Sequence, residues 1–371
     1  MASLFLILGA LIHNDKLNWQ ITRKEVEFYS FLAVMWMVSY FFGLGMHEET
    51  FKFMVKMTKL FICIFFICRI VHTYEDFNLI IATFIFGAAF LGYQAHASGD
   101  FSTGRIDNIG GSDFAEANAF ATFMLVGASM LGYKIIRLKL WQTVPAVLII
   151  AMMLNAFVLA RSRGALVGIL FATPFAMFNM PKKYRLKVSL FVVLGAILFF
   201  NLMDEGFLER METIQTESQA GYAGLQVIDS ENLTRLDFWR TSIDIFRDHP
   251  MGIGSRNFES TVTMYDPRNP GFDAHNTIVL CYTEFGVVGI SIFFLIFFET
   301  YLELRRIKKM AQFTQNQEYI NLNLISISTI LIIYAFGSIL THSYVYIEIL
   351  WLFLTLPMCL EKATKNMVSF S

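Results

Sequence analysis

Apolar runs of about 17 to 25 residues alternate with polar connections along most of this chain. A helix of this length crosses the hydrocarbon core of a bilayer, and lipid offers the backbone no partners outside the helix. The pattern therefore predicts an all-α polytopic membrane protein with roughly eleven transmembrane helices. The expected spans are residues 1–13, 27–45, 53–71, 77–95, 114–133, 141–160, 164–180, 186–203, 276–299, 321–340 and 343–360.

The distribution of lysine and arginine sets the expected orientation. Every second connection is rich in these residues, as around Lys182 and Arg305, and the positive-inside rule places such connections in the cytoplasm. The large polar segment 204–275 then lies in the periplasm. Met1 would also lie outside, and because 1–13 is short for a span we expect a missing upstream helix or a start site placed too late.

The composition agrees with a membrane protein. Hydrophobic residues make up 56% of the chain, the mean hydropathy is +0.53 and the formal net charge is −1. This apolar share exceeds that of a soluble domain. The four cysteines all lie in apolar runs, so neither a disulfide framework nor a CxxC metal pattern is expected.

The polar segment divides the chain into three expected domains: N-terminal membrane helices in 1–203, a periplasmic catalytic loop in 204–275, and C-terminal membrane helices in 276–371.

The loop contains arginine but no lysine. Its arginines are Arg210, Arg235, Arg240, Arg247, Arg256 and Arg268. Guanidinium binds phosphate through a bidentate fork that ammonium lacks. The loop therefore predicts a site for a phosphate-bearing substrate that is held in the membrane.

An apolar stripe at helical spacing runs through the loop and is followed by Pro250. The stripe consists of Leu233, Leu236, Trp239, Ile243 and Phe246. It predicts an amphipathic helix that lies on the bilayer surface or against the helix bundle.

The arginines of this helix differ in their local partners. Arg240 and Arg247 have aspartates at helical spacing, so ordinary surface ion pairs explain them, although Arg240 stays a candidate for substrate binding. Arg235 lies beside Trp239 and has only Glu231 as a local acid. We therefore expect Arg235, together with Trp239, to face the site.

Two other outer segments carry candidate residues. Arg161 and Arg163 lie between two apolar helices, where they either snorkel to lipid headgroups or bind an anionic ligand on the outer face. Arg105 lies in a glycine-rich segment that is either a plain surface turn or a ligand loop. Asn118 lies just inside the next helix, where an amide usually bonds another helix and less often a substrate.

His275 lies where the polar loop meets an apolar helix, and it is followed by Asn276. It is either an ordinary interfacial histidine or a group of the site that titrates near neutral pH. Asp229 and Glu231 form an acidic pair of the kind that metal-dependent enzymes use, so a metal-dependent alternative stays open.

Several short motifs follow one another in a fixed order along the chain. They are Ser162–Ala165, Arg235 with Trp239, Asp248–Pro250, Gly252-x-Gly254, Phe258, His275-Asn276 and Glu284-x-Gly286-x-x-Gly289. The ordered set resembles the O-antigen ligase and polymerase superfamily. The first half, especially HEETFKFMVKMTKL and GRIDNIGGSDFAEANAFA, is similar to O-glycosylation ligases of the exosortase-associated type. The resemblance covers most of the chain and departs from the family at the N-terminus.

This resemblance implies a metal-independent, inverting glycosyltransferase with a GT-C-like membrane fold in the bacterial inner membrane. Members of the family move a glycan from undecaprenyl pyrophosphate to a hydroxyl on the periplasmic side. The acceptor is lipid A core, a protein or the growing glycan, so ligase and polymerase both stay open. The family's essential residues correspond to Arg163, Arg235 and His275, and no cofactor, metal or nucleic-acid partner is implied.

The chemistry of the residues agrees with this implication. Two arginines can stabilise the charge that develops on a departing pyrophosphate, and a histidine can accept the proton of an acceptor hydroxyl. A transporter is a further alternative; it would show internal repeats or charged sites at the bilayer midplane, and the chain shows no clear repeat. The expected substrate-binding residues are Arg161, Arg105, Arg240, Asn276, Asn118 and Trp239.

Overall fold

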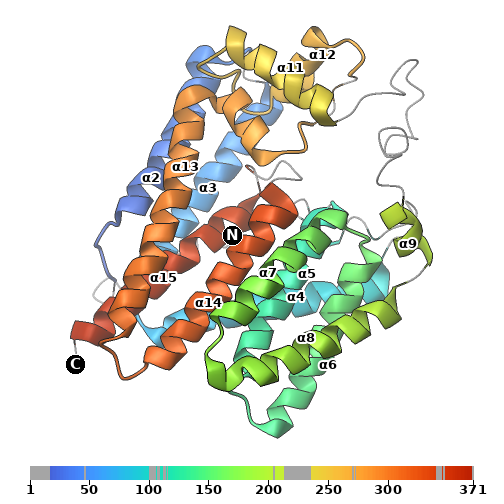
Figure 1. Cartoon of the computed structure of the whole chain (residues 1–371). Helices are drawn as coiled ribbons and strands as arrows, with labels where there is room; N and C mark the ends of the chain where they lie inside the picture. The colour runs from blue at the N-terminus through green and yellow to red at the C-terminus, as the bar shows by residue number, and fades with distance from the viewer. Residues whose placement is uncertain are drawn as a thin grey trace. The chain divides into compact units, whose positions relative to one another are not determined.

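In the computed structural model of the chain, the regular secondary structure of the described residues is helical, and these residues contain no strand (Figure 1). The expectation of an all-α chain is therefore confirmed for this part. The expected span 1–13 lies outside it. The structure describes residues 17–45, 47–99, 106, 109–111, 114, 116–203, 205–212, 235–269, 271, 273–339, 345 and 347–369.

Five helices of the described part are long and apolar enough to cross a membrane, and each coincides with an expected span. Helices also overlap the expected spans 27–45, 53–71, 114–133, 164–180 and 343–360, but their length or composition does not reach the same threshold. The count of eleven spans therefore stays a prediction. The five helices are Tyr74–Ala97, Trp141–Leu159, Lys182–Leu202, Thr277–Ala311 and Gln317–Gly337.

The chain packs as two compact units. Unit 1 comprises Met1–His72, Ile214–Glu303 and Ile339–Cys359, and unit 2 comprises Thr73–Thr213, Leu304–Ser338 and Leu360–Ser371. This division follows packing, whereas the expected boundaries at 203/204 and 275/276 follow membrane topology. The expected domains therefore stay a prediction, and each unit is described by itself.

Unit 1 is built around a buried aromatic cluster. Its helices are α2 (Arg23–Met37) with its π-helical continuation η2 (Val38–Phe42), α3 (Glu48–Ile70), α11 (Arg235–Asp248), α12 (Phe258–Tyr265), and the first parts of α13 (Thr277–Ala311) and α15 (Glu348–Ser369). Trp351 is fully buried. Its ring centroid lies 5.5 Å from the ring centroid of Phe28 and 5.1 Å from those of Phe31 and Phe61. The rings meet edge-on or tilted, and aromatic pairs prefer such geometries to face-to-face stacking.

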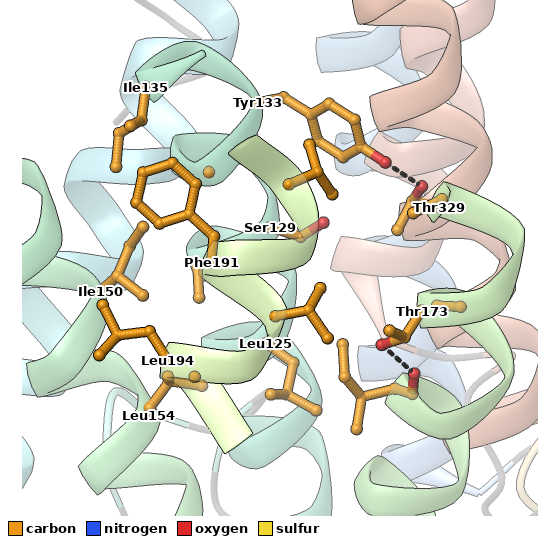
Figure 2. A pocket seen from close by; sticks show the side chains of 18 of the residues that line it. Leu125, Ser129, Tyr133, Ile135, Ile150, Leu154, Thr173, Phe191, Leu194 and Thr329 are labelled. Atoms are coloured by element: carbon orange, nitrogen blue, oxygen red, sulfur yellow. Dashed lines mark hydrogen bonds between the residues drawn. The ribbon is translucent and has the colours of Figure 1, made fainter. Parts of the chain in front are cut away.

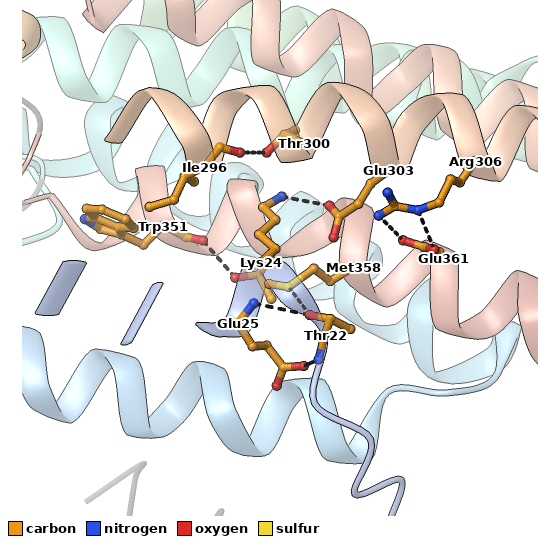
Figure 3. A network of polar contacts seen from close by, with 11 residues as sticks. Thr22, Lys24, Glu25, Ile296, Thr300, Glu303, Arg306, Trp351, Met358 and Glu361 are labelled. Atoms are coloured by element: carbon orange, nitrogen blue, oxygen red, sulfur yellow. Dashed lines mark hydrogen bonds and ion pairs between the residues drawn. The ribbon is translucent and has the colours of Figure 1, made fainter. Parts of the chain in front are cut away.

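Two buried ion pairs join the helices of unit 1. Lys24 Nζ lies 2.9 Å from Glu303 Oε2, and Arg69 Nη1 lies 2.6 Å from Glu25 Oε1. All four side chains are at most 1% exposed. Figure 3 shows Lys24 of α2 pointing toward Glu303 of α13. Because an isolated buried charge is costly, these pairs favour the packing of α2 against α13 and α3.

Unit 2 is arranged around α5 (Ala117–Ile135), most of whose residues are buried. This helix packs against α4, α6, α7 and α14. A Cβ added to Gly168 would lie 2.7 Å from the Ile333 carbonyl oxygen, so α7 and α14 approach each other closely there. The helices around α5 are α4 (Tyr74–Ser98), α6 (Leu140–Leu159), α7 (Arg163–Asn179), α8 (Lys182–Leu202), α9 (Glu205–Glu212) and α14 (Gln317–Tyr334) with η6 (Ala335–Ile339).

An apolar cavity of about 230 Å³ lies within unit 2, lined by α5, α6, α7, α8 and Thr329 of α14 (Figure 2). Tyr133 and Thr329 bond each other at 2.8 Å, and Thr173 donates to the Ile169 carbonyl at 2.8 Å. These hydroxyls are therefore satisfied within the protein. Helix α8 has no buried residue, so its apolar side chains are packed less tightly than those of α5.

One expected helix differs clearly from its prediction. We expected it to end at residue 299, yet α13 continues to Ala311 and includes Arg305 and Lys309. The cluster of cations marks a change in polarity, but arginine and lysine are good helix formers, so it does not end the helix. Gly286 interrupts the helix with a φ of 64°.

Candidate active site

The predicted site residues fall on both units. Trp239 and His275 belong to unit 1, whereas Asn118, Arg161 and Arg163 belong to unit 2. The two groups are therefore built up separately, beginning with unit 1.

Helix α11 is attached to the start of α13 by a hydrogen bond. Trp239 Nε1 donates to the Ala274 carbonyl oxygen at 3.2 Å, and Ala274 directly precedes His275. Arg235 is the first residue of α11 and lies about 6 Å along the helix axis from Trp239. The backbone of Arg235 is thus brought to the neighbourhood of His275, although its side chain lies outside the described part.

His275 has a strained backbone. Its φ angle is 48°, a left-handed conformation that residues other than glycine rarely adopt, and its side chain is half-buried. The flanking residues hold it there: the Ala274 amide donates to Asp273 Oδ1 at 2.8 Å, and Asn276 Oδ1 accepts from the amides of Ile278 and Val279. Asn276, expected to bind substrate, therefore has a structural role as the cap of α13.

The interruption of α13 at Gly286 is bridged by the segment that follows α11. The Ile253 amide donates to the Thr283 carbonyl at 3.1 Å, and the Gly254 amide donates to the Glu284 carbonyl at 2.9 Å. In return, the Val287 amide donates to the Pro250 carbonyl at 3.0 Å. The backbone groups released by the break are thus satisfied, as buried peptide groups must be.

Glycines permit this contact because the two backbones nearly touch. A Cβ on Gly286 would lie 2.3 Å from the Met251 carbonyl carbon, and a Cβ on Gly252 would lie 2.5 Å from the Glu284 carbonyl oxygen. The buried Glu284 carboxylate also accepts from the Phe258 amide at the start of α12, at 3.2 Å. The motif residues Gly252, Glu284 and Gly286 therefore build the junction between α13 and the segment after α11, a role that sequence analysis did not assign.

In unit 2, Arg163 is the first residue of α7. The preceding residue, Ser162, caps the helix by accepting from the Ala165 amide at 3.2 Å, and its hydroxyl donates to Asn118 Oδ1 at 2.8 Å. Asn118 thus bonds another helix, which is the more usual of the two roles considered for it. Because the N-terminal end of a helix carries partial positive charge, Arg163 and α7 together form an electropositive position.

Arg161 lies against α9. A Cβ placed on Gly206 would lie 2.3 Å from the Arg161 guanidinium carbon, so the guanidinium rests on the backbone of Gly206. Arg161 has a φ of 48°, and such strain is concentrated at functional sites. The role of Gly206 was not predicted, because nothing in its sequence neighbourhood indicates the contact.

Residues 148–294 match the family model described as O-antigen ligase. This segment is therefore similar to the O-antigen ligase family. The matched segment includes Arg163, Arg235 and His275, and it confirms the resemblance to the O-antigen ligase superfamily. No curated protein matches the chain significantly. The similarity to the exosortase-associated type stays an expectation.

Within the matched segment, the described arginine side chains of the polar loop pair with local acids. Arg240 lies 3.8 Å from Asp237, and Arg247 lies 3.0 Å from Asp244. Arg268 contacts Asp266 at 2.8 Å, and this hydrogen bond lowers the pKa of Asp266 below its usual value. The absence of lysine from the loop therefore does not by itself make each arginine a phosphate ligand. The Arg240 side chain is 78% exposed.

The amphipathic helix of the polar loop is confirmed, but its packed face is rotated from the expected one. Phe238, Ser242 and Ile245 are buried, whereas Leu236 and Ile243 are exposed. The expected stripe included the last two, because periodicity alone does not determine which apolar edge packs inward. The exposed pair leaves an apolar edge suited to a bilayer surface.

The remaining candidate residues lie outside the described part of the chain. These are Arg105 and the acidic pair of Asp229 and Glu231. Among the described residues there is no group of three or more His, Cys, Asp or Glu side chains that could hold a metal ion.

Proposed function

We propose that this protein is an inverting, metal-independent glycosyltransferase that moves a glycan from undecaprenyl pyrophosphate to an acceptor hydroxyl. The reaction takes place at the periplasmic face of the bacterial inner membrane, in a GT-C-like fold of roughly eleven spans. The family match over residues 148–294 carries this proposal, since it contains all three proposed catalytic residues. The same donor chemistry serves a ligase or a polymerase.

In the proposed reaction, the acceptor oxygen attacks the anomeric carbon of the sugar as the bond from that carbon to the pyrophosphate oxygen breaks. Inversion follows because attack and departure occur on opposite faces. Arg163 and Arg235 stabilise the negative charge that develops on the departing pyrophosphate. His275 accepts the proton of the hydroxyl.

The positions of these residues support their roles. Arg163 lies at the electropositive start of α7, where a helix favours an anion even without side chains. His275 is held in a strained conformation at the start of α13 and is attached through Ala274 to Trp239 of α11. A base that is fixed in this way does not have to be ordered when the acceptor arrives.

The other candidates act as supporting residues. Arg161, resting on Gly206, and Asn118, bonded to Ser162, hold the start of α7 and its arginines in place. Trp239 holds α11 beside His275. Arg105, Arg240 and Asn276 complete the proposed substrate-binding set, with Arg240 contributing least because it is exposed and lies near Asp237.

The test is a transfer assay with the purified full-length protein, a glycan linked to undecaprenyl pyrophosphate, and separate acceptors. We expect release of undecaprenyl pyrophosphate, inversion at the anomeric carbon, and full activity in excess EDTA. Transfer to lipid A core, to a protein hydroxyl or to a second glycan identifies the acceptor. Loss of activity in EDTA with recovery on adding Mn²⁺ would show a metal-dependent mechanism instead.

A further inference from the structure

A second cavity, of about 370 Å³, lies in unit 2 among the ends of α4, α5 and α14. On α5, Asn118 and Lys134 are roughly 24 Å apart, at about 1.5 Å of rise per residue. Gly337, which contacts Gly164 next to Arg163, is similarly distant from Tyr319 at the start of α14. This cavity is therefore a helix length away from Arg163. Its lining residues are Asn78, Ile81, Met130, Tyr133, Lys134, Arg137, Leu138, Tyr319, Leu322, Asn323 and Ser326.

The cavity carries two cations and no carboxylate among its described lining residues. Lys134 Nζ donates to Asn78 Oδ1 at 2.6 Å and to the Tyr319 hydroxyl at 3.1 Å, both of which are neutral groups. Arg137 is exposed, and its guanidinium carbon lies 5.0 Å from the centroid of the Tyr319 ring. Asn78 and Tyr319 therefore position the charges of Lys134 and Arg137 but carry no negative charge that would balance them.

Glu318, which precedes the lining residue Tyr319 in the chain, does not balance the cavity. Glu318 interacts electrostatically with Arg137, but its carboxylate is bonded to Lys183 and to the Tyr184 hydroxyl. No carboxylate among the described lining residues balances Lys134 and Arg137. An anion entering the cavity would therefore meet uncompensated charge.

The deeper wall adds neutral hydrogen-bonding groups. Asn323 and Ser326 are 6% and 7% exposed and line the cavity from α14. Asn323 Nδ2 donates to the Tyr319 carbonyl at 3.0 Å, and the Ser326 side chain lines the cavity from the next turn of the helix. A buried hydroxyl that faces a cavity is a ready donor to a ligand oxygen.

We infer that this cavity binds the phosphate headgroup of an anionic phospholipid. The charged groups suit a phosphodiester, and Ile81, Met130, Leu138 and Leu322 supply an apolar side suited to the lipid backbone. The cavity also lies at the ends of α4 and α14, two helices long enough to span a membrane, at the level where headgroups are found. A soluble phosphate compound would share the anionic chemistry but would not use the apolar side.

The experiment uses the full-length protein, delipidated in a neutral detergent, with binding followed by native mass spectrometry. The probes are phosphatidylglycerol, phosphatidylcholine and inorganic phosphate. We expect phosphatidylglycerol to bind at least tenfold more tightly than phosphatidylcholine. Arg137→Gln removes a charge-assisted contact from an exposed side chain and should weaken phosphatidylglycerol binding about tenfold. Ser326→Leu fills the cavity at unchanged charge and should abolish the preference.

The matched control is Lys308→Gln, which removes an exposed cation of unit 2 that does not line the cavity. We expect it to keep the preference for phosphatidylglycerol. Equal losses for Lys308→Gln and Arg137→Gln would overturn the site in favour of general surface charge. Inorganic phosphate binding that depends on Arg137, without any preference between the lipids, would overturn the assignment to a lipid. Neither outcome bears on glycan transfer, which is measured separately.

Discussion

At the scale of single residues, two members of the proposed site, Arg161 and His275, share a positive φ angle of 48°. Such strain costs about 1–3 kcal/mol and persists only where the surroundings enforce it. Sequence analysis selected both residues from their types and positions at the ends of apolar helices. It could not find Gly206 or the supporting role of Gly286, because these depend on contacts between segments distant in the sequence.

Replacing Arg163 by lysine keeps the charge but removes the bidentate fork, and the same holds for Arg235. We expect each variant to lose about 10²-fold or more in transfer, the usual effect of removing one group that stabilises developing charge. Arg247→Lys is the matched control, since Arg247 forms an exposed pair with Asp244. A similar effect of all three substitutions in a purified assay would remove the two arginines from the site.

Gly206→Ala tests whether the position of Arg161 matters. The added Cβ would lie 2.3 Å from the guanidinium carbon and would displace that side chain. We expect the Michaelis constant for the donor to rise while the thermal stability changes little, because a flexible side chain can move away. Gly195→Ala, where no atom lies within 4 Å of the new Cβ, should change neither. An unchanged Michaelis constant in Gly206→Ala would separate Arg161 from donor binding.

At the scale of elements, the helices follow the sequence closely where periodicity and stop signals agree. Among the described residues, helix α11 spans Arg235–Asp248 and ends shortly before Pro250, where its pattern predicts a stop. Helix α13 extends to Ala311, beyond the expected span 276–299, because a charged segment can continue a helix. Its interruption at Gly286 was not predicted, since an isolated glycine inside an apolar run indicates several structures equally well.

Gly286→Ala should disturb the junction between α13 and the segment after α11. Alanine is strained at a φ of 64°, and its Cβ would meet the Met251 carbonyl carbon at 2.3 Å. We expect a loss of more than about 1–3 kcal/mol in stability, seen as a lower thermal unfolding temperature in detergent. Gly87→Ala in α4 is the control, because its Cβ meets no atom within 4 Å. It should be neutral or slightly stabilising, and an equal loss in both would contradict the role of the junction.

At the scale of the whole molecule, the class of the protein follows from composition and from the length of its apolar runs. The buried ion pairs could not be predicted, because Lys24 and Glu303 are far apart in the sequence and each resembles an ordinary charge at a membrane boundary. Their burial becomes evident only when α2 packs beside α13. Orientation in the membrane stays a prediction from the lysine and arginine distribution.

Lys24→Met should leave the Glu303 carboxylate buried without its cation. Breaking a buried pair in this way costs about 3–5 kcal/mol, so the thermal unfolding temperature should fall sharply. The double variant with Glu303→Met removes both charges and should recover most of the stability. Failure of the second substitution to restore stability would show that Lys24 acts through something other than this pair.

The most direct test of the proposed mechanism is the rate of transfer at saturating donor as a function of pH, for the native protein and for His275→Ala. A general base must be neutral to accept a proton, and histidine has a reference pKa of about 6.5, so the native rate should rise with pH through this region. His275→Ala should bind donor normally, lose about 10²–10⁴-fold in rate and lose this pH dependence, whereas His249→Ala should behave as the native protein. If His275→Ala instead keeps its saturated rate and pH profile and only raises the donor Michaelis constant, His275 is a binding residue and not the base.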